Sequence, residues 1–334
     1  MRSDSFAGVE RYVSMVAPRL AARGCDVTVV GGDPAHMALS SDVVGWRPAS
    51  TTWQVARELK RLGRLDVVHA HMTAAEIAAV ITKPHHHARL VTTLHFAIPR
   101  GSGGRRGLLM PVGWLMDEQI AISEFVAATV HSNRVLLNGV ETTEPGPSRR
   151  DRRVLVMQRL EKEKHTDVAL RAWSVSGLRN CDWTLVIAGR GTQLSQLKQL
   201  AIDLNLSRSV EWAGFIDDPT QLLARSALLL APAPAEPFGL TVVEAMARAT
   251  PVIAANGGAH PETVGADGWL FPPGDAVACA RLLDSIPHRD LEPYGAHLRS
   301  RQLELFDIEA HTDRLLKVYV DLAGSTRRSG ERGL

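Results

Sequence analysis

Residues 227–248, ALLLAPAPAEPFGLTVVEAMAR, indicate a strand, a loop and a helix in succession. The apolar run 227–231 is short and ends at Pro232, which is typical of a buried strand. Pro237 and Gly239 disfavour helix before Leu240, whereas residues 241–248 carry a good helical pattern. The sequence therefore predicts a helix whose N-terminus points into the loop that follows the strand.

The predicted loop is suited to binding an anion. Backbone N–H groups of Phe238, Gly239 and Leu240 would be free at the helix N-terminus, where the helix dipole also favours negative charge. A phosphate there would repel the flanking carboxylates of Glu236 and Glu244, so hydroxyl groups are their expected partners. A ligand with hydroxyl groups on both sides of a diphosphate is a nucleotide-sugar. For the two glutamates alone, solvated side chains are the simpler interpretation.

The composition is ordinary for a soluble globular enzyme, with 45% hydrophobic and 22% charged residues in a chain long enough for about two domains. A net charge of +2 argues against a nucleic-acid binder that relies on bulk electrostatics. Cys25, Cys181 and Cys279 are scattered, which predicts reduced thiols rather than a disulfide framework or a zinc site. Without a membrane-length apolar run or a signal peptide, we expect a cytoplasmic protein.

Short apolar runs alternate with helical patterns along the chain. The first half has predicted strands at 27–30, 67–69, 90–94 and 119–122, with helices at 10–22 and 73–81. The second half has predicted strands at 154–157, 184–188, 210–212, 228–231 and 252–254. This alternation predicts an α/β fold with two Rossmann-like domains, each a parallel sheet wound by helices. Ligands of such domains bind at the carboxyl ends of the strands, where most motifs fall.

The predicted domains are 1–140 and 154–308, joined by a linker at 141–153 that is rich in proline, glycine and charge. The last residues, 323–334, are expected to be disordered. No Asp-x-Asp pair is present to hold a divalent ion, so we expect no metal site. Arg159 and Lys164, which follow the predicted strand 154–157, could instead stabilise charge that develops on phosphates. A solvated basic loop is the alternative for these two residues.

Further motifs surround these features. The run E-P-F-G-L-T-V-V-E-A-M-A is followed by 251–254 (PVIA) and 257–262 (GGAHPE). With these motifs the chain closely resembles the retaining glycosyltransferases of the family-4 type, which have the GT-B fold. Seven more motifs occur in the family's order, and together they are far more specific than any one alone. They are residues 6–11 (FAGVER), 66–71 (DVVHAH), 93–95 (TLH), 137–140 (LNGV), 159–164 (RLEKEK), 188–191 (AGRG) and 214–216 (GFI).

The resemblance implies two domains that face each other across a cleft, with a helix over 309–322 crossing back to the N-terminal domain. The implied catalytic residues are Glu236 at the sugar, Arg159 and Lys164 at the phosphates, and His95 near the reacting centre. The implied donor-binding residues are Gly8, Gly189, Phe215, Phe238, Gly239, Leu240, Thr241 and Glu244, of which Glu244 would hold the ribose. A plain core role for Phe215 and a structural role for His95 are the alternatives.

The chain also departs from the family pattern. Ala7 replaces one glycine of the family's Gly-Gly-x-Glu loop, His165 replaces the glycine that usually follows the lysine, and Phe96 follows His95 where the family often has glycine or aspartate. The family's apolar first strand has no counterpart, because residues 1–5 are polar. Such a strand is central in the sheet, so we expect a truncated start or an unusually small first domain.

The N-terminal half would bind the acceptor. His69 and His71 alternate on a predicted strand and residues 85–87 are three histidines, but no matching ligands follow at helical spacing, so structural or solvated roles are favoured over metal binding. Residues 100–106 (RGSGGRR) are a basic loop before the apolar stretch 108–116. A mobile acceptor loop, a weak membrane-surface contact and an ordinary exposed loop are the three interpretations.

We therefore expect a retaining, metal-independent glycosyltransferase that uses a nucleoside-diphosphate sugar, such as a UDP- or GDP-linked one, and needs no cofactor. The acceptor would be a hydroxyl group of a small molecule or a glycan, and no nucleic-acid partner is expected. As the resemblance implies, the acceptor oxygen attacks on the face from which the diphosphate departs. The alternatives are a non-catalytic partner of another transferase and a nucleotide-sugar epimerase or phosphorylase of related fold.

Overall fold

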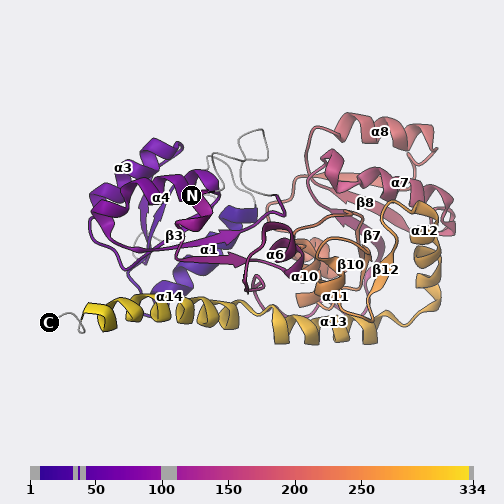
Figure 1. Ribbon diagram of the computed structural model, residues 1–334. Helices are drawn as coiled ribbons and strands as arrows, with labels where there is room; N and C mark the ends of the chain where they lie inside the picture. The colour runs from indigo at the N-terminus through magenta and orange to yellow at the C-terminus, as the bar shows by residue number, and fades with distance from the viewer. Residues whose placement is uncertain (1–7, 33–36, 38–42, 99–110, 331–334) are drawn as a thin grey trace. The chain divides into compact units, whose positions relative to one another are not determined.

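The computed structural model describes residues 8–32, 37, 43–98 and 111–330 (Figure 1), and side chains as far as residue 324. The chain divides into two compact units. Unit 1 comprises Met1–Gly139 and Ile308–Leu334, and unit 2 comprises Val140–Asp307. Each unit has parallel sheets and helices in alternation, so the prediction of two Rossmann-like domains is confirmed.

Unit 2 contains one sheet of six strands in the order β12-β11-β10-β7-β8-β9, with every neighbouring pair parallel. The strands are β7 (Asp151–Met157), β8 (Thr184–Ala188), β9 (Val210–Gly214), β10 (Ser226–Ala231), β11 (Val252–Ala255) and β12 (Trp269–Phe271). Numbered from β7, this is the order 3-2-1-4-5-6 of a Rossmann fold. The chain direction across the sheet reverses between β7 and β10, and the crevice at such a point is where Rossmann folds bind ligands.

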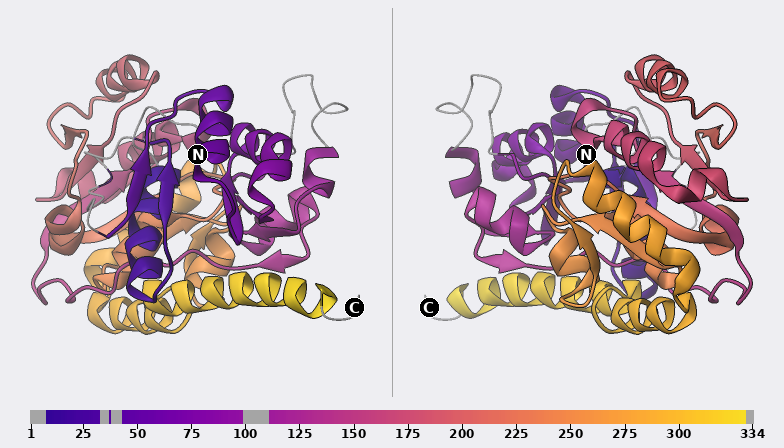
Figure 2. Two further views of the ribbon diagram at one scale, coloured as in Figure 1. Left: turned by 90° about the vertical axis from the view of Figure 1, so that its left-hand side faces the viewer. Right: turned by 90° about the vertical axis from the view of Figure 1, so that its right-hand side faces the viewer.

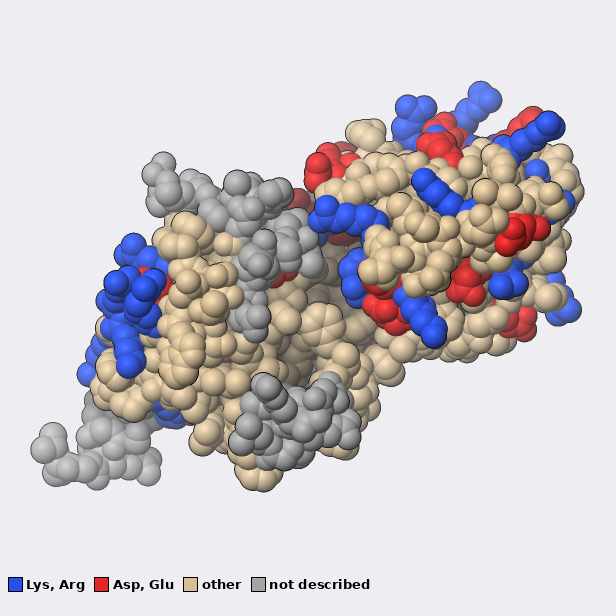
Figure 3. Space-filling view, turned by 90° about the horizontal axis from the view of Figure 1, so that it is seen from above, with Lys and Arg blue, Asp and Glu red and all other residues tan. Residues whose placement is uncertain are grey.

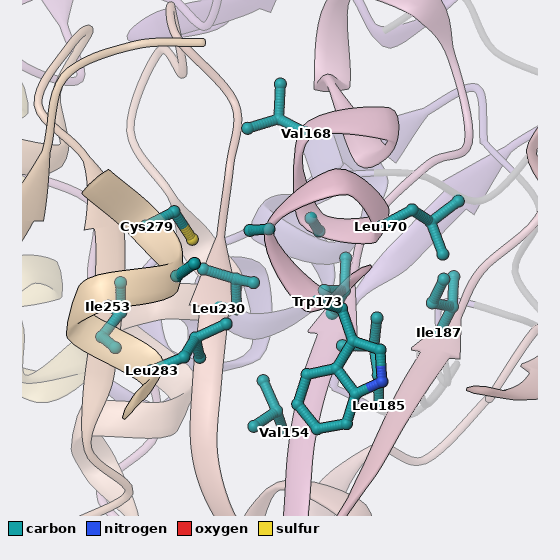
Figure 4. Packing of buried hydrophobic residues seen from close by; sticks show 14 of the residues in the cluster. Val154, Val168, Leu170, Trp173, Leu185, Ile187, Leu230, Ile253, Cys279 and Leu283 are labelled. Atoms are coloured by element: carbon teal, nitrogen blue, oxygen red, sulfur yellow. The ribbon is translucent and has the colours of Figure 1, made fainter. Parts of the chain in front are cut away.

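Helices connect the strands of unit 2. They are α7 (Thr166–Val175), α8 (Leu194–Asp203), α9 (Thr220–Arg225), α10 (Leu240–Ala247), α11 (His260–Val264), α12 (Ala276–Ser285) and α13 (Leu291–Leu305), with short 3₁₀ turns η1 (Lys162–Lys164), η2 (Gly177–Asn180) and η3 (Ile286–His288). The fully buried Trp173 of α7 lies at the centre of a cluster formed by the sheet and α12 (Figure 4). Its indole N–H donates to Ser209 Oγ at 3.0 Å, so the polar atom of this large side chain is satisfied.

Unit 1 contains two parallel sheets among the described residues. The larger has the order β3-β4-β5-β6, made of β3 (Val67–His71), β4 (Arg89–Leu94), β5 (Glu118–Ala121) and β6 (Arg134–Val135). The smaller pairs β1 (Thr28–Val30) with β2 (Gly45–Arg47). One apolar cluster includes residues of both sheets together with α1 and α14. The expectation of a missing first strand falls on residues 1–7, which lie outside the described part of the chain.

The helices of unit 1 are α1 (Gly8–Ala22), α3 (Thr52–Leu62), α4 (Thr73–His86), α6 (Glu124–Val130) and α14 (Ile308–Gly330). The C-terminal helix α14 is long and continuous (Figure 2) and packs against α1. Arg19 and Arg23 of α1 form ion pairs with Glu309, and Arg23 also pairs with Asp313. The tail that we expected to be disordered, 323–334, includes the last residues of α14, which extends to Gly330.

The predicted linker 141–153 is not a free connection. Unit 2 begins at Val140, whose N–H donates to the Phe306 carbonyl at 2.8 Å, and β7 already starts at Asp151. Arg150 donates hydrogen bonds to Thr250 Oγ1 and to the backbone carbonyls of residues 224, 248 and 249. Residues 141–149 are mostly exposed, and the Arg150 guanidinium holds the end of this segment to unit 2.

Candidate functional site

Lys164 and Glu236 meet at the crevice of the unit 2 sheet. Lys164 ends the 3₁₀ turn that follows β7, and Glu236 lies in the loop that follows β10. Their strands are the two neighbours at which the strand order reverses, so both side chains reach the same place from opposite directions. Lys164 Nζ lies 2.5 Å from Glu236 Oε2, and the two side chains are only 15% and 20% exposed. The structure thus brings together two of the four predicted catalytic residues.

The backbone of Glu236 is held by the loop after β11. Its carbonyl accepts a hydrogen bond from Ala259 N at 2.8 Å. Gly258 has φ of +59°, and a Cβ there would lie 2.4 Å from Glu236 N. Only glycine combines this left-handed conformation with so close an approach. The motif at 257–262 therefore acts by fixing the position of the Glu236 backbone.

The N-terminus of α10 presents unused backbone donors beside this ion pair. Gly239 is the N-cap with φ of 89°, and its carbonyl accepts the first helical hydrogen bond, from Val243 N. Within the described residues, no hydrogen bond is found from the N–H groups of Gly239, Leu240 and Thr241. The Gly239 and Leu240 groups are two of the three amides predicted to bind an anion, and the helix dipole favours negative charge at this end of α10.

Phe238 contributes to this site through its backbone alone. Its ring is buried against Phe306 in an edge-on contact at 5.8 Å, and its carbonyl accepts a hydrogen bond from Thr263 Oγ1. The ring thus anchors the loop to the core, which holds the following amides in place. Glu244 is buried in the second turn of α10, eight positions after Glu236 as the sequence motif requires.

His260 is a buried neighbour of the Lys164–Glu236 pair. It lies at the start of α11, and its Nδ1 donates a hydrogen bond to the Ala255 carbonyl at 3.2 Å. Burial lowers the pKa of His260, and the charge of Lys164 lowers it further, although Glu236 opposes the shift. His260 is therefore a neutral ring that supports the loop rather than a third charge.

Arg159 does not join the ion pair. It forms an ion pair with Glu163 at 2.9 Å, and both side chains are about three-fifths exposed. A surface pair of this kind contributes little to stability, so Arg159 is free to change partner when a ligand binds. His165, the departure from the family glycine, has φ of 49° and lies between η1 and α7. This is the left-handed region that favours glycine, so His165 keeps the expected backbone geometry in spite of its side chain.

The loops after β8 and β9 form the other side of the crevice. Gly189 has φ of +144°, and a Cβ there would lie 1.9 Å from the Gln158 carbonyl, so its evident task is close packing of the two loops. Phe215 follows β9 and is 48% exposed, which excludes the plain core role. The Arg190 guanidinium lies over its ring at 4.3 Å. This exposed pair offers a flat surface and hydrogen-bond donors to a planar ligand.

Unit 1 contains a second cluster of polar side chains, at the carboxyl ends of β3 and β4. It includes four residues of the sequence motifs (His69, His71, Thr93 and His95) together with Tyr12, His311 and Tyr319. Parallel pairing of β3 and β4 sets His71 opposite Thr93, which explains why two separate motifs meet. His311 and Tyr319 come from α14, so the C-terminal helix is part of this cluster.

The hydrogen bonds of His311 in this cluster have a fixed direction. The Leu137 carbonyl can only accept, so His311 Nδ1 donates to it at 2.7 Å and its Nε2 accepts from the Tyr12 hydroxyl at 2.9 Å. His69 is held at both ring nitrogens, with Nε2 2.8 Å from Thr93 Oγ1 and Nδ1 2.5 Å from the Tyr319 hydroxyl oxygen.

His95 and His71 form a separate pair. His71 Nδ1 and His95 Nε2 are 3.0 Å apart, and both residues are less than a tenth exposed. Burial lowers the pKa of His95 to about 3, that of His69 to about 3 and that of His311 to about 4. The pKa of His71 is also lowered, first by burial and then by the neighbouring histidines. All four rings are therefore neutral at physiological pH.

The remaining sequence hypotheses have mixed outcomes. Gly8 is the exposed first residue of α1, and the loop before it lies outside the described residues, as does the basic loop 100–106. In the histidine run, His86 is buried and bonds backbone groups at Ala79 and Ala88, which agrees with a structural role. Among the described residues, no group of three or more histidine, cysteine, aspartate or glutamate side chains could hold a metal ion.

Sequence reasoning missed the link between the histidine motifs and α14. Part of the signal was present, because strands 67–69 and 90–94 were predicted in one parallel sheet with histidines near their carboxyl ends. Tyr12, His311 and Tyr319 carry no local signal and are identified only by the packing of α1 and α14.

The surface of unit 2 shows no patch of one charge on the face in Figure 3, where basic and acidic side chains are interspersed. No described helix has the length and apolar character needed to cross a membrane.

The chain matches two family models in sequence order. Residues 6–144 match the model described as Glycosyltransferase Family 4, and residues 142–296 match the model described as Glycosyl transferases group 1. A glycogen synthase of Mycobacterium tuberculosis is 29% identical over 312 residues, which cover 83% of this chain and 74% of the relative. A phosphatidyl-myo-inositol mannosyltransferase of Mycolicibacterium smegmatis is 26% identical, covering 90% of this chain and 82% of the relative.

Solved structures agree on the fold. HepE of Anabaena, crystallised with UDP, superposes with a TM-score of 0.82 at 20% identity and covers 96% of this chain and 98% of its own. A sucrose-phosphate synthase of Thermosynechococcus elongatus superposes with a TM-score of 0.79 at 19% identity, covering 96% and 94%. These likenesses establish the two-domain GT-B fold that the sequence motifs predicted.

Proposed function

The chain belongs to glycosyltransferase family 4, and from that premise we propose that it transfers a hexose from a nucleoside-diphosphate sugar to a hydroxyl acceptor, with retention and without a metal ion. The observation that carries the proposal is the Lys164–Glu236 pair at the switch point of the unit 2 sheet, beside free amides of α10. A relative bound to UDP and one that uses GDP-mannose support a UDP- or GDP-linked donor.

The diphosphate is bound by unit 2. Lys164 and the N–H groups of Gly239, Leu240 and Thr241 would hold the phosphate oxygens, and Arg159 would leave Glu163 to join them. These are fixed positive charges and dipoles at the place where negative charge grows as the bond to the sugar breaks. Because these groups can stabilise the leaving diphosphate themselves, we expect the reaction to proceed without magnesium.

The two glutamates would hold the hydroxyl-bearing ends of the donor. Glu236 accepts hydrogen bonds from the sugar and stabilises the positive charge that develops on its ring, while Glu244 accepts from the ribose. The nucleobase would stack on the exposed pair of Arg190 and Phe215. In the transfer, the acceptor oxygen forms a bond to the anomeric carbon as the bond to the phosphate oxygen breaks on the same face. The leaving phosphate takes the acceptor's proton.

His95 would act as a neutral hydrogen-bonding group toward the sugar. Because burial keeps its pKa near 3, the ring is neither a general acid nor a cation at neutral pH. A sugar hydroxyl can both donate and accept, so a single nitrogen of a neutral ring can bond it in either tautomer. Its position after β4 is at the carboxyl edge of the unit 1 sheet, where such folds bind ligands.

The acceptor surface of unit 1 includes apolar side chains beside a cation. Trp114 and Leu115 are 76% and 53% exposed, and Leu115 and Lys83 line a cavity of about 440 Å³. This combination suits weak contact with an anionic membrane surface. Co-sedimentation with anionic phospholipid vesicles that weakens with added salt and in Trp114→Ala would support this membrane contact. The same amount of sedimented protein with and without vesicles would contradict it.

Proton NMR of donor turnover tests the proposed reaction without knowledge of the acceptor. An α-linked donor such as UDP-glucose or GDP-mannose is incubated with the protein in EDTA and without an acceptor, so that water takes the place of the acceptor. We expect slow release of nucleoside diphosphate with the α-anomer of the free sugar appearing first. Initial release of the β-anomer contradicts retention, and turnover only after addition of magnesium contradicts metal independence. An altered nucleotide-sugar without release would indicate an epimerase, and binding without turnover would indicate a non-catalytic relative.

A further inference from the structure

The pairing of His71 with His95 is not explained by the packing of unit 1 alone. His71 is the last residue of β3, and His95 follows the last residue of the neighbouring strand β4. The contact joins two ring nitrogens 3.0 Å apart, and it is the one hydrogen bond found for His95 within the described residues. Stability would be served equally well by apolar side chains, because a buried polar pair gives little net gain over an apolar one.

We propose that His71 is a positioning residue that fixes the ring plane of His95 and leaves one defined nitrogen of that ring for substrate. This inference rests on the proposed function of His95 at the donor. Both rings are neutral, so one of the two facing nitrogens carries the proton of this hydrogen bond and the other accepts it. With Nε2 engaged by His71, Nδ1 of His95 is the nitrogen available to substrate.

The surrounding side chains leave this task to His71. His69 lies two residues earlier on β3, but both of its nitrogens are engaged, by Tyr319 and Thr93. His311 likewise uses both nitrogens, on Leu137 and Tyr12. The Tyr12 ring contacts His71 and His95 edge-on at 5.6 Å and 5.4 Å, which restricts rotation of both rings without supplying a hydrogen bond to either.

Two variants separate the hydrogen bond from the volume of the side chain. His71→Ala removes the partner, whereas His71→Asn keeps an amide nitrogen or oxygen at the position of Nδ1, two bonds from Cβ. We expect His71→Ala to lower kcat by about tenfold to a hundredfold, as loss of an orienting partner does at histidine sites. His71→Asn should recover most of that loss. Because unit 2 binds the nucleotide, the Kd for UDP or GDP should be unchanged in both.

His86→Asn is the matched control. His86 is a buried histidine of the same unit, but it bonds only backbone groups of Ala79 and Ala88, so its replacement should lower stability without lowering kcat. Equal losses of kcat in His71→Asn and His71→Ala, or no loss in either beside a large loss in His95→Ala, would overturn the proposal.

Nitrogen-15 NMR of the histidine rings gives a readout that packing does not move. With signals assigned by comparison with His95→Gln, Nε2 of His95 in the wild-type protein should show the chemical shift of a hydrogen-bonded ring nitrogen, and His71→Ala should lose it. Absence of that shift in the wild-type protein overturns the proposal even if the variants fail to fold. The shift in a protein that transfers no sugar would instead refute the proposed function and leave the pairing intact.

Discussion

Replacing Glu236 with glutamine is predicted to strengthen nucleotide binding and to slow transfer. The carboxylate holds Lys164 Nζ at 2.5 Å in a pocket that leaves about a fifth of either side chain exposed. A nucleoside diphosphate must therefore take the ammonium group from Glu236 and also approach a negative charge. Glutamine has the same shape without the charge, so both obstacles to binding the phosphates are removed.

The size of the binding effect follows from Coulomb's law. Two unit charges about 4 Å apart interact by about 4 kcal/mol at an effective dielectric constant of 20 and by about 1 kcal/mol in water. The net gain in binding free energy should be near the lower value, because the site is partly exposed and Lys164 only exchanges Glu236 for the phosphates. About 1 kcal/mol corresponds to a Kd lower by roughly fivefold. Transfer should fall by about 10²–10³, the usual cost of removing one electrostatic contact to a transition state.

Two assays measure these opposite changes. Isothermal titration calorimetry with UDP and GDP in EDTA gives the Kd, and release of nucleoside diphosphate at saturating donor gives kcat. Glu211→Gln is the control, because Glu211 is an exposed carboxylate on β9 of the same unit. Weaker nucleotide binding by Glu236→Gln, or an unchanged kcat, would refute the assignment of Glu236.

Three further perturbations test other parts of the account. Lys164→Ala should lower kcat by about 10²–10³, whereas Lys162→Ala, an exposed neighbour on η1, should not; equal rates in the two would contradict the phosphate role. Gly258→Ala should lower kcat because its Cβ meets the backbone of Glu236, whereas Gly274→Ala, with φ of +80° and open surroundings, should cost only about 1 kcal/mol of stability in urea unfolding. Unit 1 should lose stability as the pH falls from 6.5 toward 4, by up to about 1.4 kcal/mol per pH unit for each buried histidine, because the histidines bind protons in the unfolded chain but not in the folded one, where their pKa is near 3 to 4. His311→Gln should flatten this slope, and an unchanged slope would refute the buried neutral ring.

The sheet of unit 2 could be predicted from its sequence because its central strands are fully buried. Apolar runs such as 184–188 and 228–231 have one interpretation when proline or glycine follows them, and β8 has the predicted bounds. The edge strands β2, β6 and β12 were missed because two or three partly exposed residues carry no periodic pattern. Their pairing is imposed by neighbouring strands rather than by their own composition.

The candidate site divides in the same way. Glu236 and Lys164 were predictable as partners of one ligand because each follows a predicted strand within a dense motif. That they form an ion pair with each other depends on the strand order, since only adjacency of β7 and β10 brings them to 2.5 Å. The exposed position of Arg159 was not predictable, because its pairing with Glu163 is decided by the turn η1. The buried state of the histidines depends on α14, which joins them from the far end of the chain.

Calorimetric titration of the wild-type protein and Lys164→Ala with UDP, GDP, ADP and dTDP in EDTA tests the central claim most directly. We predict that at least one nucleoside diphosphate binds the wild-type protein without a metal ion, and that the same nucleotide binds Lys164→Ala at least about tenfold more weakly, the loss expected for one charge-assisted hydrogen bond. Binding that appears only with magnesium, equal binding by the variant, or no binding by any of the four would contradict a diphosphate site at the switch point of unit 2.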